Sequence, residues 1–413
     1  MKRKLFALVL CLVTAAFLFT SAGADEADQA MTFSLQQAVD YALENSAAIK
    51  LANTAVDKAE VGYKEAKRAY DKTDKISGAQ RREMMTEGIV ISADAMFENY
   101  KMDEGYYKEM ADMGRTLAKA GREQAIETVK MAVQNAYFNL LFAKEKAGIQ
   151  KSVLDSAEKD MDIANKKYEL GMVSQVDVLS SEAALESARL GYNTALRDLE
   201  YQEMSFNKTL GLPLKTKVNL TDSLTHEEPP EADLEEKVTL ALQNRYEVIA
   251  AKEQYRVNEL NHKLTLGWYP ENTFVTRQAR YDMEKSHHQL VSTEQDVELS
   301  VRKAYMDMHS AYESINVLGK NVERLQKAYD IARLRYDSGM ATSQEVVNAL
   351  NALNDIKLQH LKAIHGYNLA RLQFEASSGI GIAAAGGMGT AVAGGAGGVG
   401  AAGGATAATA GGF

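Results

Sequence analysis

The stretch K-K-Y-E-L-G-M-V-S-Q-V-D-V-L, from Lys166 to Leu179, decides the fold because a close copy of it follows later in the chain. The copy reads R-L-R-Y-D-S-G-M-A-T-S-Q-E-V, from Arg333 to Val346. Each stretch carries a tyrosine, then Gly-Met three residues further on, then a hydroxyl side chain, an acid and a valine. The two glycines, Gly171 and Gly339, lie 168 residues apart in a chain of 413 residues. The chain is therefore predicted to contain one structural design twice.

Each copy has the chemistry of a tight turn between two helices. Glycine adopts the left-handed backbone conformation that ends a helix, so Gly171 and Gly339 are predicted to close the preceding helices. A hydroxyl followed three residues later by an acid is a capping box, which begins a helix. The two candidates are Ser174 with Asp177 and Thr342 with Glu345. The pattern predicts the tip of a helical hairpin.

The turn chemistry does not explain why both tips carry a methionine, Met172 and Met340. The tip of a hairpin is expected to be exposed and polar, and methionine is apolar and adaptable. Two interpretations stay open at this point. The side chains either form a docking contact for a partner, or they fold back over the turn.

Apolar residues around each tip follow the seven-residue rhythm of a coiled coil, in alternating steps of four and three. In the first copy the series is Val129, Val133, Ala136, Leu140, Ala143, Ala147, Gln150, Leu154, Ala157, Met161, Ala164 and Tyr168, with one polar member. Adding 168 to each number gives Val297, Val301, Ala304, Met308, Ala311, Ile315, Leu318, Val322, Leu325, Tyr329, Ala332 and Tyr336. Each copy is thus predicted as two antiparallel helices of about 40 residues, roughly 60 Å long.

The predicted fold class is all-α, with two tandem repeats of long antiparallel coiled-coil hairpins and β-strands short or absent. An earlier match supports the duplication, since Leu35, Val39 and Ala42 recur 199 residues later as Leu234, Val238 and Ala241. The predicted repeats cover residues 25–211 and 232–378, joined by a polar, proline-bearing linker over 212–231. Residues 379–413 are almost entirely Gly, Ala and Thr, a composition that predicts disorder.

Residues 1–24 are predicted to be a secretory signal peptide. Three basic residues precede an apolar run that is too short for a membrane span, and Ala22-Gly23-Ala24 follows as a cleavage site. The single cysteine, Cys11, lies inside this segment, so disulfides and thiol chemistry are not expected. Its removal would shift the net charge from −9 to about −12. An acidic chain is a poor match for nucleic acid, which is bound mainly through its phosphates.

No pattern in the chain predicts catalysis, a metal or another cofactor. Among the seven histidines, His287 and His288 are neighbours and His360 and His365 are five apart, neither of which is the spacing of a helical zinc site. The glycine-rich strings near the C-terminus follow no predicted strand, as a nucleotide loop would require. The sequence also contains no recognisable Ser-His-Asp order. An enzyme is therefore not expected.

The order of these motifs resembles the TolC-like outer-membrane efflux protein family. The opening F-S-L-Q-Q-A-V-D-Y-A-L-E-N-S, from Phe33 to Ser46, and the two tip stretches carry the resemblance, which covers residues 32–379. It implies a homotrimer whose subunits each give two hairpins to a tunnel of twelve helices. The tips would meet a periplasmic adaptor and an inner-membrane pump through Gly171, Met172, Gly339 and Met340. Asp177 and Glu345 would lie where the family places acids at the tunnel mouth.

Two departures from the family pattern bear on function. A basic latch residue that some members carry two positions after the second tip glycine is Ala341 here. The family also needs two membrane strands per copy, and the candidate segments, residues 72–121 and 266–290, offer only Ile89–Ile91 as a clear strand. Trp268 and Tyr269 fit either a pair at a membrane interface or, as the favoured interpretation, a folded turn before Pro270. The chain is therefore expected to be either an efflux or secretion channel component or an exported structural coiled-coil protein, in the outer membrane or the periplasm.

Overall fold

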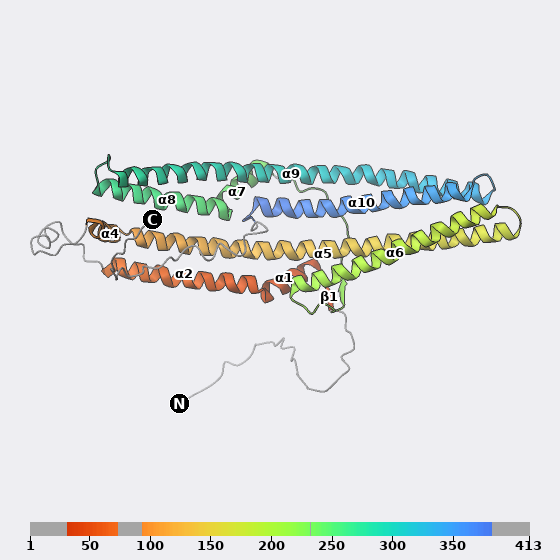
Figure 1. The fold of residues 1–413 in the computed structure, drawn as a ribbon, viewed down its shortest axis with the longest axis horizontal. Coiled ribbons are helices and arrows are strands. Elements are labelled where there is room, and N and C mark those ends of the chain that lie inside the picture. The colour runs from red at the N-terminus through yellow and green to blue at the C-terminus, as the bar shows by residue number, and fades with distance from the viewer. Residues whose placement is uncertain (1–30, 73–92, 232, 382–413) are drawn as a thin grey trace, which may run out of the picture.

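The protein is an elongated rod of helices that lie along one axis (Figure 1). The computed structural model describes residues 31–72, 93–231 and 233–381. Two helices of 64 residues, α5 (Tyr106–Glu169) and α9 (Phe274–Asp337), run the whole length of the rod. At 1.5 Å per residue each is about 96 Å long. The expected length of about 40 residues was wrong for these two helices, because the coiled-coil rhythm counted from residues 129 and 297 leaves out their first 23 residues.

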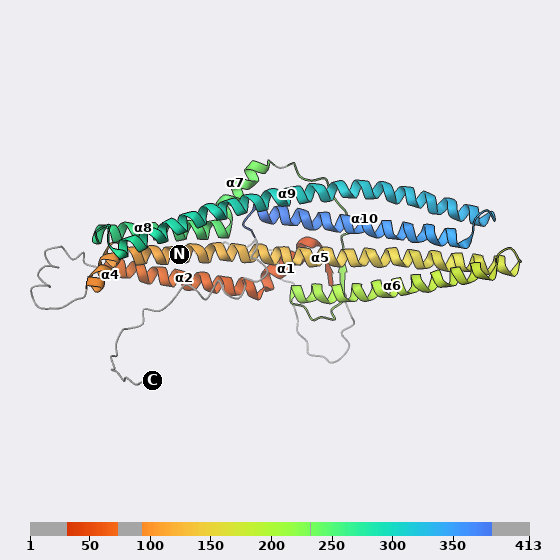
Figure 2. The same ribbon diagram turned by 45° about the horizontal axis from the view of Figure 1, so that its top comes forward.

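Each long helix is flanked by two shorter helices that follow one another along it (Figures 1 and 2). Helix α5 packs against α2 (Ala47–Lys72) and then α6 (Gln175–Leu210). Helix α9 packs in the same way against α8 (Tyr246–Trp268) and then α10 (Ser343–Ser378). The two repeats predicted from the sequence are therefore present as two equivalent halves. The helices α10 and α5 hold these halves together side by side.

Short elements complete the rod. Helices α1 (Leu35–Asn45) and α7 (Leu234–Asn244) begin the two halves, and α4 (Ala93–Asp103) precedes α5. The strand β1 (Met31–Phe33) pairs in parallel with β2 (Val218–Leu220), so the predicted linker over 212–231 contains a strand. Asp222 fixes this region, because its carboxylate accepts hydrogen bonds from the Tyr137 hydroxyl at 2.7 Å and the Leu35 amide at 3.0 Å.

The core follows the predicted coiled-coil series. In the second half the buried residues include Val301, Met308 and Ile315, which lie between α9 and α10. In the first half Val133, Leu140 and Ala143 are buried in the same way. Tyr168 and Tyr336 differ, because Tyr336 is 5% exposed and Tyr168 is 47% exposed. Every member of the two series except Tyr168 is therefore buried or partly buried.

Several expected features lie outside the described residues: the signal peptide over 1–24, the strand at Ile89–Ile91 and nearly all of the tail from residue 382. Residues 266–290 form the end of α8, a turn and the start of α9, as expected for Trp268 and Tyr269. In this turn the Tyr269 ring packs edge-on against Phe97, with 5.0 Å between their centroids. Within the described ranges, no helix has the length and apolar character to cross a membrane.

Candidate functional site at the hairpin tips

Both hairpin tips have the same backbone geometry. Gly171 has φ of +69° and Gly339 has φ of +73°, the left-handed conformation predicted for them. At the first tip the Met172 amide donates to the Lys167 carbonyl at 2.8 Å, and the Gly171 amide donates to the Tyr168 carbonyl at 2.9 Å. Equivalent bonds close the second tip. This pair of bonds is the Schellman motif, which satisfies carbonyls at the end of a helix.

Each tip then starts its second helix with a capping box. The Asp177 amide donates to the Ser174 hydroxyl at 3.3 Å, and the Asp177 carboxylate accepts from the Ser174 amide at 3.1 Å. Thr342 and Glu345 exchange the corresponding bonds at 3.3 and 3.4 Å. These bonds explain why α6 and α10 begin directly after Ser174 and Thr342.

The two tip methionines lie in solvent. Met172 is 66% exposed and Met340 is 65% exposed, so most of each side chain is accessible to another molecule. Docking at these two methionines stays a prediction. Each methionine presents an apolar surface at the end of the rod that another molecule can contact.

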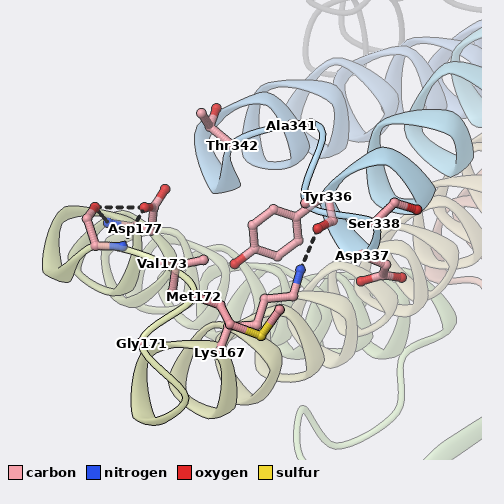
Figure 3. Close-up of a pocket in the computed structure, with 12 residues that line it drawn as sticks. Lys167, Gly171, Met172, Val173, Asp177, Tyr336, Asp337, Ser338, Ala341 and Thr342 are labelled. Carbon is pink, nitrogen blue, oxygen red and sulfur yellow. Dashed lines mark hydrogen bonds between the residues drawn. The ribbon is translucent and has the colours of Figure 1, made fainter.

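A cleft of about 370 Å³ separates the two tips (Figure 3). It brings together most of the residues that the sequence singled out: Gly171, Met172, Ser174, Asp177, Gly339 and Thr342. Met340 and Glu345 are not among the described residues that line it. Glu345 instead lies near Arg335 of its own tip, with 3.8 Å between the guanidinium and the carboxylate. The two predicted acids therefore have different surroundings.

Lys167 reaches across this cleft from the first tip to the second (Figure 3). Its Nζ lies 3.8 Å from the centroid of the Tyr336 ring and donates a hydrogen bond to the main-chain carbonyl of Tyr336. This carbonyl belongs to the last turn of α9, where the helix dipole favours a cation. A cation over an aromatic face adds a second attraction. Lys167 thus links the two tips within one chain.

Asp177 also joins the two tips. The Ser343 hydroxyl, at the start of α10, donates to the Asp177 carboxylate at 3.0 Å. Hydrogen bonds from Ser174 and then Ser343 lower the pKa of Asp177. Burial raises the pKa of the Tyr336 hydroxyl, and the negative charge of Asp177 raises it further. At ordinary pH the Asp177 carboxyl is therefore ionised and the Tyr336 hydroxyl is neutral.

A second acid, Asp160, lies between the hairpins a few turns above the tips. Its side chain on α5 is 14% exposed and lies 3.8 Å from the Arg333 guanidinium and 3.4 Å from the Tyr329 hydroxyl, both on α9. Burial raises its pKa, although the charge of Arg333 opposes that rise. Sequence reasoning did not single out Asp160, Lys167 or Ser343. The one available signal was that Lys167 has the same position in its repeat as Arg335 in the other.

The hydrogen bonds of Asp177 predict a pH dependence of stability. Asp177→Asn should lower the free energy of unfolding by about 1 kcal/mol at pH 7, since it weakens a cap and a cross-tip bond. The pKa of Asp177 is lower in the folded chain, so its contribution is complete above the unfolded value of about 4 and is lost as the pH falls through the folded value. Urea unfolding of both proteins from pH 7 to pH 2 measures this.

A matched control is Asp162→Asn, because Asp162 forms an exposed ion pair with Lys166. It should change stability little at any pH. A stability difference between the wild type and Asp177→Asn that persists unchanged to pH 2 would contradict the assignment.

The site is suited to contact rather than to catalysis. Its interactions are caps, hydrogen bonds and a cation over a ring, and they hold two hairpin tips against each other. In the ranges that the structure describes, no group of three or more His, Cys, Asp or Glu side chains is placed to hold a metal ion.

Comparisons with known proteins show which proteins this chain is similar to. The chain is similar to the outer membrane protein TolC of Salmonella enteritidis, with 20% identity over 300 residues, and of Escherichia coli strain K12, with 20% identity over 303 residues. The first match covers 61% of this chain and 61% of the relative, and the second covers 61% and 62%. The chain thus spans less than two thirds of the length of these curated relatives.

Solved structures share the fold. The outer membrane protein VceC of Vibrio cholerae aligns with a TM-score of 0.65 at 14% identity, over 84% of this chain and 97% of that one. The CmeC outer membrane channel of Campylobacter jejuni aligns with a TM-score of 0.63 at 15% identity, over 84% and 85%.

The sequence profile of the family described as outer membrane efflux protein matches residues 109–212 and 242–379, more than half of the chain. These two segments contain the two hairpins and both tips. The family consists of channel proteins and not of enzymes, which agrees with the expectation of a non-enzymatic protein of the cell envelope. The chain belongs to the outer membrane efflux protein family.

Proposed function

We propose that this chain is the outer-membrane channel component of a tripartite export system. Three copies form a helical tunnel, to which each copy contributes α5–α6 and α9–α10. The tunnel conducts substrate passively. The observation that carries the proposal is that two equivalent hairpins lie side by side and end together in tips with exposed methionines. Membership of an efflux family supports the same function.

The tips dock a periplasmic adaptor that is bound to an inner-membrane pump. Met172 and Met340 provide the apolar contacts, and Gly171 and Gly339 hold the turns that present them. Asp177 and Ser174 keep the cleft between the tips in shape, and Thr342 and Glu345 do the same for the second turn. Methionine side chains are flexible, so on a rigid turn they can adjust to the shape of a partner surface.

The double substitution Met172→Asp and Met340→Asp tests the docking role. It should leave the helix content unchanged, because both side chains are exposed, and should abolish cross-linking to the adaptor protein in the source cell. Circular dichroism and cross-linking in cells measure the two effects.

Leu51→Asp is the matched control for the double substitution. Leu51 is 71% exposed on α2, outside the tip region, so an added charge there should leave cross-linking intact. Unchanged cross-linking of the tip variant would return the methionines to a purely local role.

A second candidate function is an exported structural coiled-coil protein of the envelope. The observation that favours it is that residues 266–290, considered for strands, are helical on both sides of a short turn. Conductance in a planar lipid bilayer separates the two functions. A folded trimer that opens no channel, together with recovery in the soluble envelope fraction, would favour the structural protein.

A further inference from the structure

Equivalent apolar residues in the two halves of the chain differ in how deeply they are buried. On α5, one line of residues is partly buried: Met131, Phe138, Ile149 and Ile163. Of these, Phe138, Ile149 and Ile163 pack against clusters that include residues of α10. The residues 168 positions later on α9 are Leu299, Met306, Val317 and Ile331, and their exposed fractions run from 59% to 66%. The sequence repeats the apolar character of this face, but only the first copy is covered within the chain.

The partner helices show the same difference. Helix α10 covers α5, and none of the large apolar side chains along its described length is exposed. Its equivalent, α6, carries several that are at least 39% exposed: Val176, Leu179, Leu190, Leu196 and Tyr201. The chain thus contains one contact of the type α10 on α5. Within the described part of the chain, the equivalent faces of α6 and α9 make no such contact, and their apolar side chains are exposed.

A second copy of this chain fits both open faces. When α6 of one copy lies on α9 of another, the contact repeats the one already made by α10 on α5. This type of contact is head-to-tail, since each copy uses two different surfaces, and it closes into a ring if the rotation allows. The existing contact inside the chain supplies the template for its geometry.

The tips carry the same incomplete pattern. Lys167 covers Tyr336 within the chain, and the equivalent residues in the opposite halves are Arg335 and Tyr168. Tyr168 is 47% exposed. The Arg335 side chain is 53% exposed and turns back to its own tip, where it donates to the Met340 carbonyl at 3.3 Å.

We propose that Arg335 of one copy covers Tyr168 of the next copy and donates to its main-chain carbonyl. This contact repeats the one between Lys167 and Tyr336, so that every tip around the ring is tied to the next by one cation. A guanidinium stacks on an aromatic ring at least as well as an ammonium does. This inference rests on the proposed function, which requires several copies to assemble.

Cysteine cross-linking tests the contact directly. Cys11 is the only cysteine in the chain, so Cys11→Ser gives a background without thiols. The full chain with Tyr168→Cys and Arg335→Cys, treated with a short bismaleimide, should give covalent products of two and three chain masses. Either single substitution should give none, and co-expressed single variants should give only the two-chain product. The pair Lys167→Cys and Tyr336→Cys is the internal control, since its link should form within one chain, adding the mass of the reagent and giving no product of two chain masses.

Sedimentation of variants supplies a second measurement. Arg335→Ala should weaken association of the copies by about tenfold, and Arg335→Lys should retain it, since the contact needs only a cation. Lys167→Ala should leave association unchanged, because its contact lies within one chain. Circular dichroism verifies that each variant is folded.

The outcomes separate this inference from the proposed function. If the wild type sediments as an oligomer but the cysteine pair gives only single-chain mass, the Arg335 contact is wrong and the channel assembly stands. If the tips cross-link to a different protein and not to a second copy, the open faces belong to that protein and the inference is overturned. If the wild type sediments only as a monomer, both fail.

Discussion

Replacing Val301 with Asp is expected to unfold the second half of the rod, whereas the same change at Leu299 is not. Val301 is completely buried between α9 and its neighbours, in a cluster with Met308 and Tyr367. An uncompensated charge there should cost on the order of 3–5 kcal/mol, a large part of a typical stability of about 5–15 kcal/mol. Thermal unfolding followed by circular dichroism should show a greatly lowered melting temperature or no folded signal.

Leu299→Asp is the matched comparison, because Leu299 lies two residues earlier on the same helix and is 66% exposed. The free energy of unfolding of the monomer should change by no more than about 0.5 kcal/mol. The variant should nevertheless associate less strongly, since Leu299 lies on the α9 face proposed to contact a second copy. Equal losses of stability in the two variants would contradict the burial of Val301 and the exposure of Leu299.

Replacing Phe206 with Ala should produce the second large loss, in the first half of the rod. Phe206 is fully buried on α6, and its ring packs edge-on against Phe33 on β1 and Tyr137 on α5, with centroids 6.3 and 6.0 Å away. Truncation leaves a cavity that joins three elements, which should cost about 3–5 kcal/mol in free energy of unfolding. Urea unfolding measures the loss. Hydrogen exchange should report faster opening of β1, which loses its packing partner.

Tyr201→Ala provides the control for this prediction. Tyr201 is on the same helix and is 64% exposed, so its truncation should change the free energy of unfolding of the monomer by less than about 0.5 kcal/mol. If Phe206→Ala unfolds at the same urea concentration as Tyr201→Ala, then the cluster around Phe206 does not hold β1 and α6 together.

The hairpins and their tips could be predicted from the sequence because local rules govern them. Apolar spacing sets the buried face of a helix, and Gly171, Ser174 and Asp177 place the end of one helix and the start of the next. Helix length was predicted less well. The first parts of α5 and α9 pack against α2 and α8, so their apolar residues follow other neighbours and do not continue the same series.

Gln150 illustrates what the pattern could not explain. In the sequence it is the one polar member of an apolar series, whereas in the structure its side-chain amide donates to Asn354 on α10 at 3.1 Å. A Cβ on Gly191 would lie 2.8 Å from the Gln150 side-chain oxygen, so the glycine makes room for it. Both partners are more than 40 residues away in the chain, and no local rule connects them.

The sequence by itself determined the duplicated hairpins, their capped glycine turns and the family, because each depends on residues that are close together in the chain. Only the tertiary structure decided which of two equivalent faces is covered, that Lys167 spans the tips, and that Tyr168 is exposed while Tyr336 is buried. The physical reason is that the two copies are nearly the same in sequence pattern. Which copy is covered depends on where the other half of the chain packs, and that contact joins residues up to 226 positions apart in the chain.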